Sequence, residues 1–149
     1  MRRSLALVAV LALAIAVVAG TAGGASQGAA KVSTRHTSLG TILVDSKGRT
    51  LYLFEKDKTS KSTCSGACAT NWPPMTTSGK PTASGSAKAS KLGTSKRSDG
   101  STQVTYNGHP LYLFVADKNK PGSTKGEGVD AFGAEWYVVG TNGKKIDKD

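Results

Sequence analysis

Three groups of residues in this chain are of types that could do chemistry: a close pair of cysteines, two histidines, and two aspartates in a repeated motif. Cys64 and Cys68 are the only cysteines, with three residues between them. If the intervening turn is helical, the two Cα atoms lie about 6 Å apart, within the range of a disulfide. Because a close pair outside the cell most simply forms a disulfide, we expect a structural bridge worth about 2 kcal/mol.

A metal or redox interpretation of the same cysteines stays open. Cys64, Cys68 and Met75 follow the spacing of a Cys-x3-Cys-x3-His-x2-Met copper site, except that Trp72 stands at the histidine position. Two thiolates and a thioether suit Cu(I) better than zinc. His109 could join them through the fold, because it lies at a predicted hairpin turn. The alternative function is therefore an extracytoplasmic redox or copper-binding protein.

The repeated aspartates, Asp57 and Asp117, could in principle act as an acid and base pair. Each follows the end of a predicted strand, where an aspartate commonly accepts backbone N–H groups of the next turn, and this structural role is favoured. Tyr52 and Tyr112 are similarly expected to be core aromatics with a bonded hydroxyl. No serine-hydrolase elbow or zinc-protease motif is present. We expect no enzyme activity, no catalytic residues and no cofactor.

The elements that carry these residues are two copies of one unit. Eight identities recur at a fixed offset of 60 residues, which is a strong signal of an internal repeat. The first copy holds Val44, Gly48, Leu51, Tyr52, Leu53, Phe54, Asp57 and Lys58, and the second Val104, Gly108, Leu111, Tyr112, Leu113, Phe114, Asp117 and Lys118.

Each copy is predicted to be a β-hairpin, turning at Lys47-Gly48 in the first and at Asn107-Gly108 in the second. On the returning strand of the first copy, Tyr52 and Phe54 share one face while Leu51 and Leu53 share the other, so both faces are expected to be buried. The fold class is all-β (mainly β): two hairpin units packed into one small sheet or sandwich. A short helix near residues 67–71 is the only helix expected.

The chain is expected to be exported. Arg2 and Arg3 precede an apolar run over residues 5–19 and a stretch of small residues, the order of a secretory signal peptide, which we place at residues 1–25. A flexible lead-in over residues 26–38 would then precede a single β domain. No membrane span is expected in the mature form.

That domain would cover residues 39–149, with repeats at 39–75 and 100–140 joined by a polar linker over 76–99. The linker prediction depends on composition, because small and polar residues cannot bury enough surface to offset their ordering entropy.

The whole chain has 20 Lys and Arg residues against 10 Asp and Glu, a formal net charge of +10. Removing the signal peptide takes away two arginines and leaves a strongly basic domain. Such a charge favours anionic partners, and an anionic component of the cell envelope is the partner we expect. No nucleic-acid-binding motif accompanies the scattered lysines, so no specific nucleic acid is expected.

The residues that carry a family resemblance lie in both copies. The first run is Gly40-Thr-Ile-Leu-Val-Asp-x-x-Gly48-x-x-Leu-Tyr-x-Phe-x-x-Asp57, with Cys64-x-Gly66-x-Cys68 and Trp72-Pro-Pro74 after it; the second includes Gln103-x-Thr-Tyr-Asn-Gly108, Pro110-Leu-Tyr112 and Gly133-x-x-Trp136. Over residues 39–140 this resembles the bacterial secreted-repeat lipoprotein family, known for a tandem Tyr-x-(Phe/Trp/Tyr)-x-x-Asp motif. The resemblance implies a secreted protein without an established substrate. Because no lipobox cysteine is present, we expect a released or charge-held protein.

Overall fold

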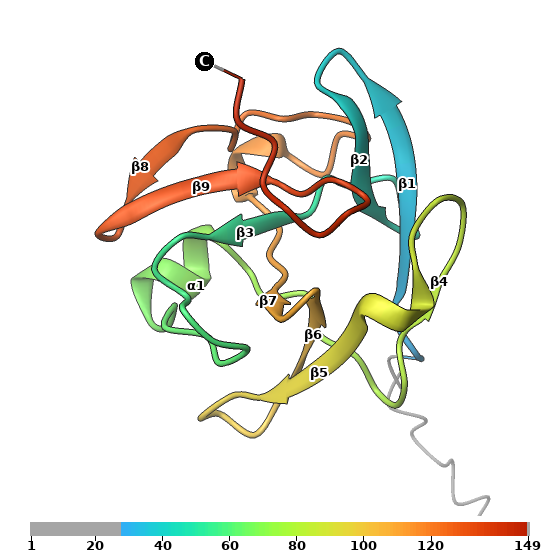
Figure 1. The fold of residues 1–149 in the computed structure, drawn as a ribbon. Helices are drawn as coiled ribbons and strands as arrows, with labels where there is room; N and C mark the ends of the chain where they lie inside the picture. Colours follow the sequence, from blue (N-terminus) through green and yellow to red (C-terminus); the bar gives the residue numbers. More distant parts are fainter. Residues whose placement is uncertain (1–27, 149) are drawn as a thin grey trace, which may run out of the picture.

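Over residues 28–148, which the computed structural model describes, the chain forms nine β-strands in three small sheets, with one short α-helix (Figure 1). The sheet orders are β2-β1-β4, β3-β9-β8 and β5-β6-β7. The mainly β fold with two repeats is thereby confirmed. The predicted helix is α1 (Ala67–Asn71). The strands are β1 (Lys31–Thr37), β2 (Gly40–Asp45), β3 (Tyr52–Phe54), β4 (Thr82–Ala83), β5 (Leu92–Lys96), β6 (Thr102–Tyr106), β7 (His109–Pro110), β8 (Val129–Ala131) and β9 (Ala134–Val138).

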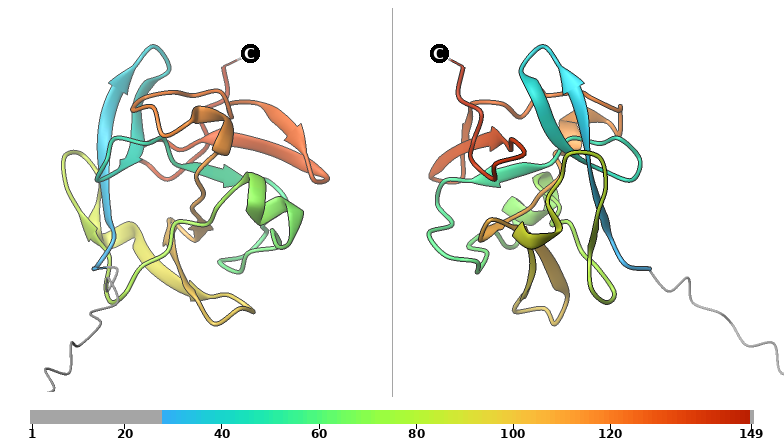
Figure 2. Two further views of the ribbon diagram at one scale, coloured as in Figure 1. Left: turned by 180° about the vertical axis from the view of Figure 1, so that it is seen from behind. Right: turned by 45° about the vertical axis from the view of Figure 1, so that its right-hand side comes forward.

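The two repeats begin with equivalent antiparallel hairpins, β1–β2 and β5–β6. The β1–β2 hairpin lies in the upper part of the molecule and the β5–β6 hairpin in the lower part (Figures 1 and 2), and side chains of both meet in one core cluster. The strand that follows each hairpin returns only briefly along it: the Leu51 N–H donates to the Leu43 carbonyl at 3.1 Å, and the Leu111 N–H to the Val104 carbonyl at 3.0 Å. In the first repeat the chain then continues as β3, which pairs with β9.

Two predictions made from composition are wrong. Residues 31–37 of the predicted flexible lead-in form β1, and residues 82–83 and 92–96 of the predicted linker form β4 and β5. Both longer strands bring one apolar side chain to the core, Val32 and Leu92, and are otherwise held by backbone pairing. β1 lies between β2 and β4, and β5 is at the edge of its sheet, so backbone pairing orders both strands and a count of apolar side chains underestimates that order.

The two turns predicted from the sequence, which follow β2 and β6, differ in length by one residue. Asn107 and Gly108, at φ 51° and 79°, form the predicted two-residue turn. In the first repeat the Asp45 N–H pairs with the Arg49 carbonyl at 2.9 Å, which leaves three residues in the loop, with Gly48 at φ 78°. The first turn is thus a three-residue loop that needs glycine at its left-handed position, and not the two-residue turn predicted.

The core has two clusters, one on each face of the returning strands. Tyr52 and Phe54 lie in one cluster and Leu51 and Leu53 in the other, so the predicted division of faces is confirmed. We call the first the aromatic cluster (Ile42, Val44, Tyr52, Phe54, Cys64, Cys68, Trp72, Tyr112, Trp136, Val138) and the second the aliphatic cluster (Val32, Leu43, Leu51, Leu53, Met75, Val104, Tyr106, Leu111, Tyr137, Val139).

The predicted signal peptide lies outside the described residues. Among residues 28–148, no helix is long and apolar enough to span a membrane.

Candidate functional site

The tyrosines and aspartates of the repeated motif are bonded across the two copies. The Tyr52 hydroxyl donates to Asp117 Oδ2 at 2.6 Å, and the Tyr112 hydroxyl donates to Asp57 Oδ2 at 2.5 Å. Both tyrosines are fully buried, and the two aspartates are 5–6% exposed. Each copy therefore supplies the phenol that satisfies the carboxylate of the other.

The same exchange is present in the backbone. The Tyr52 N–H donates to the Tyr112 carbonyl at 2.9 Å, and the Tyr112 N–H to the Tyr52 carbonyl at 3.0 Å, as a single antiparallel bridge. Reciprocal bonds between equivalent residues indicate an approximate two-fold relation between the copies, as at the interface of a symmetric dimer.

Each aspartate also holds the loop that follows it. Asp57 Oδ1 accepts the N–H and the hydroxyl of Thr63, both at 2.7 Å. Asp117 Oδ1 accepts the Ser123 hydroxyl at 2.7 Å and the Lys125 N–H at 3.0 Å. The bonds to backbone N–H groups are of the capping kind expected, whereas the bonds from the tyrosines of the other copy were not foreseen.

The electrostatics keep both tyrosines protonated. Burial, reinforced by the bonded carboxylate, raises the pKa of Tyr52 and of Tyr112 far above that of an exposed tyrosine. Acid–base catalysis is efficient when the group has a pKa near the working pH. A phenol held this far above neutrality is suited to a permanent donated hydrogen bond.

Four aromatic rings, two from each copy, form a stacked column in the core. Trp72 and Trp136 stack with ring centroids 3.9 Å apart and planes 4° from parallel. Phe54 stacks on Trp136 at 4.0 Å, and Phe114 on Trp72 at 3.9 Å, so each phenylalanine lies on the tryptophan of the other copy. Sequence reasoning predicted Phe54 and Phe114 as core residues but missed the equivalence of the tryptophans, although each copy carries one after its Asp.

The predicted cysteine pair is a disulfide, with Sγ atoms 2.02 Å apart and Cα atoms 5.3 Å apart. The residues of the copper alternative are not brought together: Met75 lies in the aliphatic cluster while both cysteines lie in the aromatic one. His109 is on β7, paired with Tyr106. Among residues 28–148, no group of three or more His, Cys, Asp or Glu residues is placed to hold a metal ion.

Sequence reasoning gave no role to Arg97. Its guanidinium donates to the Cys64 carbonyl at 2.7 Å, to the Ser62 hydroxyl at 2.9 Å and to the Gln103 amide oxygen at 2.8 Å. The Ser62 hydroxyl is in turn 2.7 Å from the Tyr112 hydroxyl. Arg97 therefore ties the disulfide loop of the first copy to the sheet of the second.

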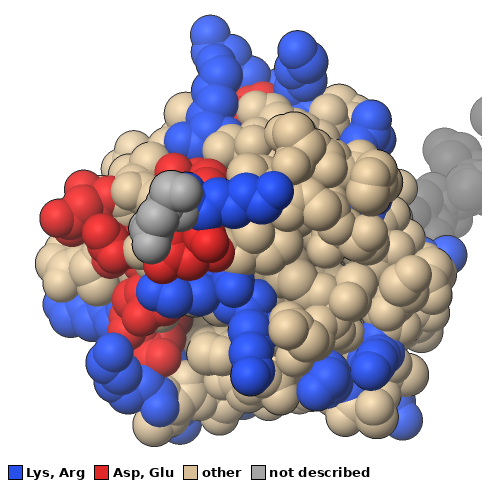
Figure 3. Space-filling model, turned by 45° about the horizontal axis from the view of Figure 1, so that its top comes forward, with Lys and Arg blue, Asp and Glu red and all other residues tan. Residues whose placement is uncertain are grey.

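The surface charge is uneven. The viewed face in Figure 3 has its carboxylates gathered on the left, while Lys and Arg side chains are scattered at its top, centre and lower edge. Lys145 lies 3.6 Å from Glu55 and 3.4 Å from Asp147. Of the nine described Asp and Glu residues, Asp45, Asp57 and Asp117 are buried, so the cations at the surface outnumber the carboxylates still further.

Comparison with known proteins gives one match. A family model described as a secreted repeat of unknown function matches residues 33–76 and 93–140, which together make up more than half of the chain. The second matched segment starts on β5, inside the predicted linker. No curated protein and no solved structure matches the chain significantly.

Proposed function

The chain belongs to the family of secreted repeats of unknown function, and we propose that it acts there as a non-enzymatic domain that binds an anionic component of the cell surface or envelope. The tyrosine–aspartate bonds between the copies support the first part of this proposal, that the domain is not an enzyme. Tyr52, Tyr112, Asp57 and Asp117 each have a buried partner within the fold. Groups engaged in this way hold the two copies together, and a structural use of the motif explains why it occurs twice.

The charge distribution supports the anionic partner. Eighteen Lys and Arg residues lie within residues 28–148, against nine Asp and Glu of which three are buried. A surface of this sign attracts polyanions over a distance of about 10 Å in 0.1 M salt. The envelope is where a secreted protein meets such polymers.

Binding of the mature secreted protein to immobilised anionic wall polymer tests the proposal. We expect retention at 20 mM salt and release on raising the salt towards 0.5 M, because the attraction is screened. A neutral polysaccharide of similar length is the control and should not retain the protein. Absence of retention on the anionic polymer at low salt would overturn the proposal.

A further inference from the structure

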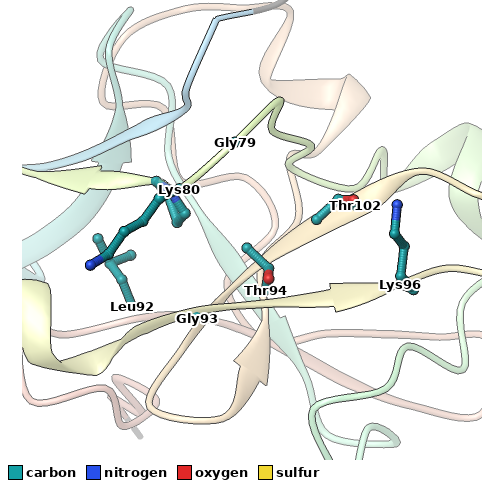
Figure 4. Close-up of a pocket in the computed structure, with 8 residues that line it drawn as sticks. Gly79, Lys80, Leu92, Gly93, Thr94, Lys96 and Thr102 are labelled. Atoms are coloured by element: carbon teal, nitrogen blue, oxygen red, sulfur yellow. The ribbon is translucent and has the colours of Figure 1, made fainter.

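A groove of about 480 Å³ lies against one face of the β5–β6 hairpin, where segment 79–81 passes over it (Figure 4). Lys80 and Lys96 stand towards its two ends, and Thr94 lies between them on β5 (Figure 4). Leu92 and Pro81 contribute its apolar part, and Thr102 adds a second hydroxyl. The charged groups that line it are thus ammonium donors, accompanied by hydroxyls.

A second groove, of about 330 Å³, shares Lys96 and continues past it to Arg97 and Lys61. Its remaining lining comes mostly from serine and threonine, together with Cys64 of the disulfide loop. The two grooves meet at Lys96, and three lysines follow one another along them, because the Arg97 guanidinium is bonded within the fold. We call the two together the lysine groove (Lys61, Lys80, Lys96).

The lysine groove is distinguished by its sign. No Asp or Glu lines either of its parts, whereas grooves elsewhere on the described surface include Asp45 or Asp117. The carboxylate closest in sequence, Asp99 in the β5–β6 turn, accepts the N–H and the hydroxyl of Ser101 at 2.9 and 2.6 Å. An anion in the groove would therefore meet ammonium and hydroxyl groups of its lining and no carboxylate.

The shape and lining of the groove indicate what kind of anion fits. Cations at both ends and near the middle suit a chain with regularly repeated charges better than one small anion. No aromatic side chain lines either part. Proteins that bind single-stranded nucleic acids rely on aromatic rings for base stacking. A flexible phosphodiester chain without bases has no such requirement, and its hydroxyl-bearing units can bond to the threonines and serines.

We propose that the lysine groove is the binding site for the anionic envelope component, and that this component is a linear phosphodiester polymer of the poly(glycerol phosphate) type. The inference rests on the proposed function and specifies its site and its ligand class. With three lysines engaged, log Kd should change with log salt by a slope of roughly 2, since each phosphate contact on a single chain contributes about 0.7.

Two double variants test the site in the mature secreted protein, with poly(glycerol phosphate) as the probe. Lys80→Gln/Lys96→Gln should weaken binding at least about tenfold and lower the salt slope by roughly 1.4. Lys61→Gln/Lys80→Gln should do the same without touching the bond that Lys96 donates to the Gly100 carbonyl at 3.3 Å. The matched control, Lys118→Gln/Lys120→Gln, removes the same charge from exposed positions near Asp117 and should change binding less than about threefold.

The outcomes separate the inference from the proposed function. If the wild-type protein binds the polymer and all three double variants weaken that binding equally, binding depends on net charge alone. The assignment of the lysine groove as the binding site is then overturned, while the proposed function stands. If wild type does not bind at low salt, both fail. If single-stranded DNA or polyglutamate of equal charge binds as tightly and with the same dependence on Lys80 and Lys96, the assignment to a phosphodiester wall polymer is overturned.

Discussion

The two copies build the connection from their aspartate to their tryptophan in different ways. We call residues 57–72 the first Asp–Trp segment and residues 117–136 the second. The first contains the Cys64–Cys68 disulfide and α1. The second is longer, has no cysteine, and ends in the β8–β9 hairpin, which extends the sheet of β3. Both segments place an aspartate and a tryptophan at equivalent positions in the core. The disulfide therefore stabilises the segment of the first copy, as strand pairing stabilises that of the second.

The two segments are also held in place by different contacts. In the first, Arg97 donates to the Ser62 hydroxyl and to the Cys64 carbonyl, in addition to the bonds that Asp57 accepts. In the second, Gly126 passes directly over Tyr52, and its N–H donates to the Tyr52 hydroxyl at 3.2 Å. A Cβ at Gly126 would lie 2.6 Å from Tyr52 Cε1, so no other residue fits there without displacing the ring. The second segment depends more heavily on its aspartate and on close packing.

The largest difference is expected between alanine substitutions of the two aspartates. Asp117→Ala removes the acceptor of three donors, from Tyr52, Ser123 and Lys125, and should destabilise the fold by about 4 kcal/mol. Asp57→Ala also removes the acceptor of three donors, but should cost only about 2 kcal/mol: the disulfide still holds the segment, and Tyr112 keeps Ser62 at 2.7 Å, whereas Tyr52 keeps only the Ser123 carbonyl at 3.4 Å. Urea unfolding of both variants measures the difference; equal losses would show that the segments depend equally on their aspartates.

Alkaline pH should lower the stability of the fold through both exchanged tyrosines. The pKa of Tyr52 and Tyr112 is raised in the folded state, so above pH 10 the unfolded chain releases protons that the folded chain retains. Stability is therefore full below pH 10 and falls above it, by about 1.4 kcal/mol per pH unit for each tyrosine. Urea unfolding at intervals from pH 9 to 11 measures the slope. Tyr52→Phe and Tyr112→Phe should each remove one tyrosine's share; an unchanged slope in either variant would exclude that tyrosine.

Removing the disulfide should affect one segment only. Cys64→Ser/Cys68→Ser frees a five-residue loop and should cost about 2 kcal/mol in the chain-entropy model. Faster amide exchange is expected over residues 57–72 and unchanged exchange over 117–136, because the second segment is held by pairing with β9. A thiol titration of the native protein should find none free. Two free thiols, or equal loosening of both segments, would contradict the assignment of the bridge to the first segment alone.

The sequence predicts the parts of this fold that depend on large side chains and turn residues. Alternation along residues 51–54 correctly divides the core into two clusters, and Asn107-Gly108 correctly places the second hairpin turn. The repeat itself follows from identities at one offset. These signals are local, and each residue type has a direct physical reason to occupy its position.

The exchange between the copies could not be predicted in this way. Nothing local to Tyr52 distinguishes a bond with Asp57, five residues along, from the observed bond with Asp117. The choice follows from how β3 leaves its own hairpin to pair with β9, a long-range property. Strands β1 and β5 were missed for a related reason, since their order comes from backbone pairing with β2 and β6, which composition does not report.

The smallest predicted effect concerns the turn between β8 and β9 in the second segment. Between Ala131 and Ala134, Phe132 lies at φ 62° and Gly133 at φ 94°, the same left-handed pair of positions that Asn107 and Gly108 occupy. Asparagine tolerates this conformation, whereas a bulky residue is strained there. The Phe132 side chain is also 42% exposed, so little packing offsets the strain.

Phe132→Asn should therefore stabilise the protein by about 1 kcal/mol, measured as a higher urea midpoint with an unchanged slope. Val115→Asn is the control: Val115 is 48% exposed but is not at positive φ, so its replacement should change stability by less than about 0.5 kcal/mol. A loss of stability in Phe132→Asn would mean that the ring supports the hairpin by packing. The second segment would then have its own substitute for the disulfide at its tip, in addition to the pairing of β8 with β9.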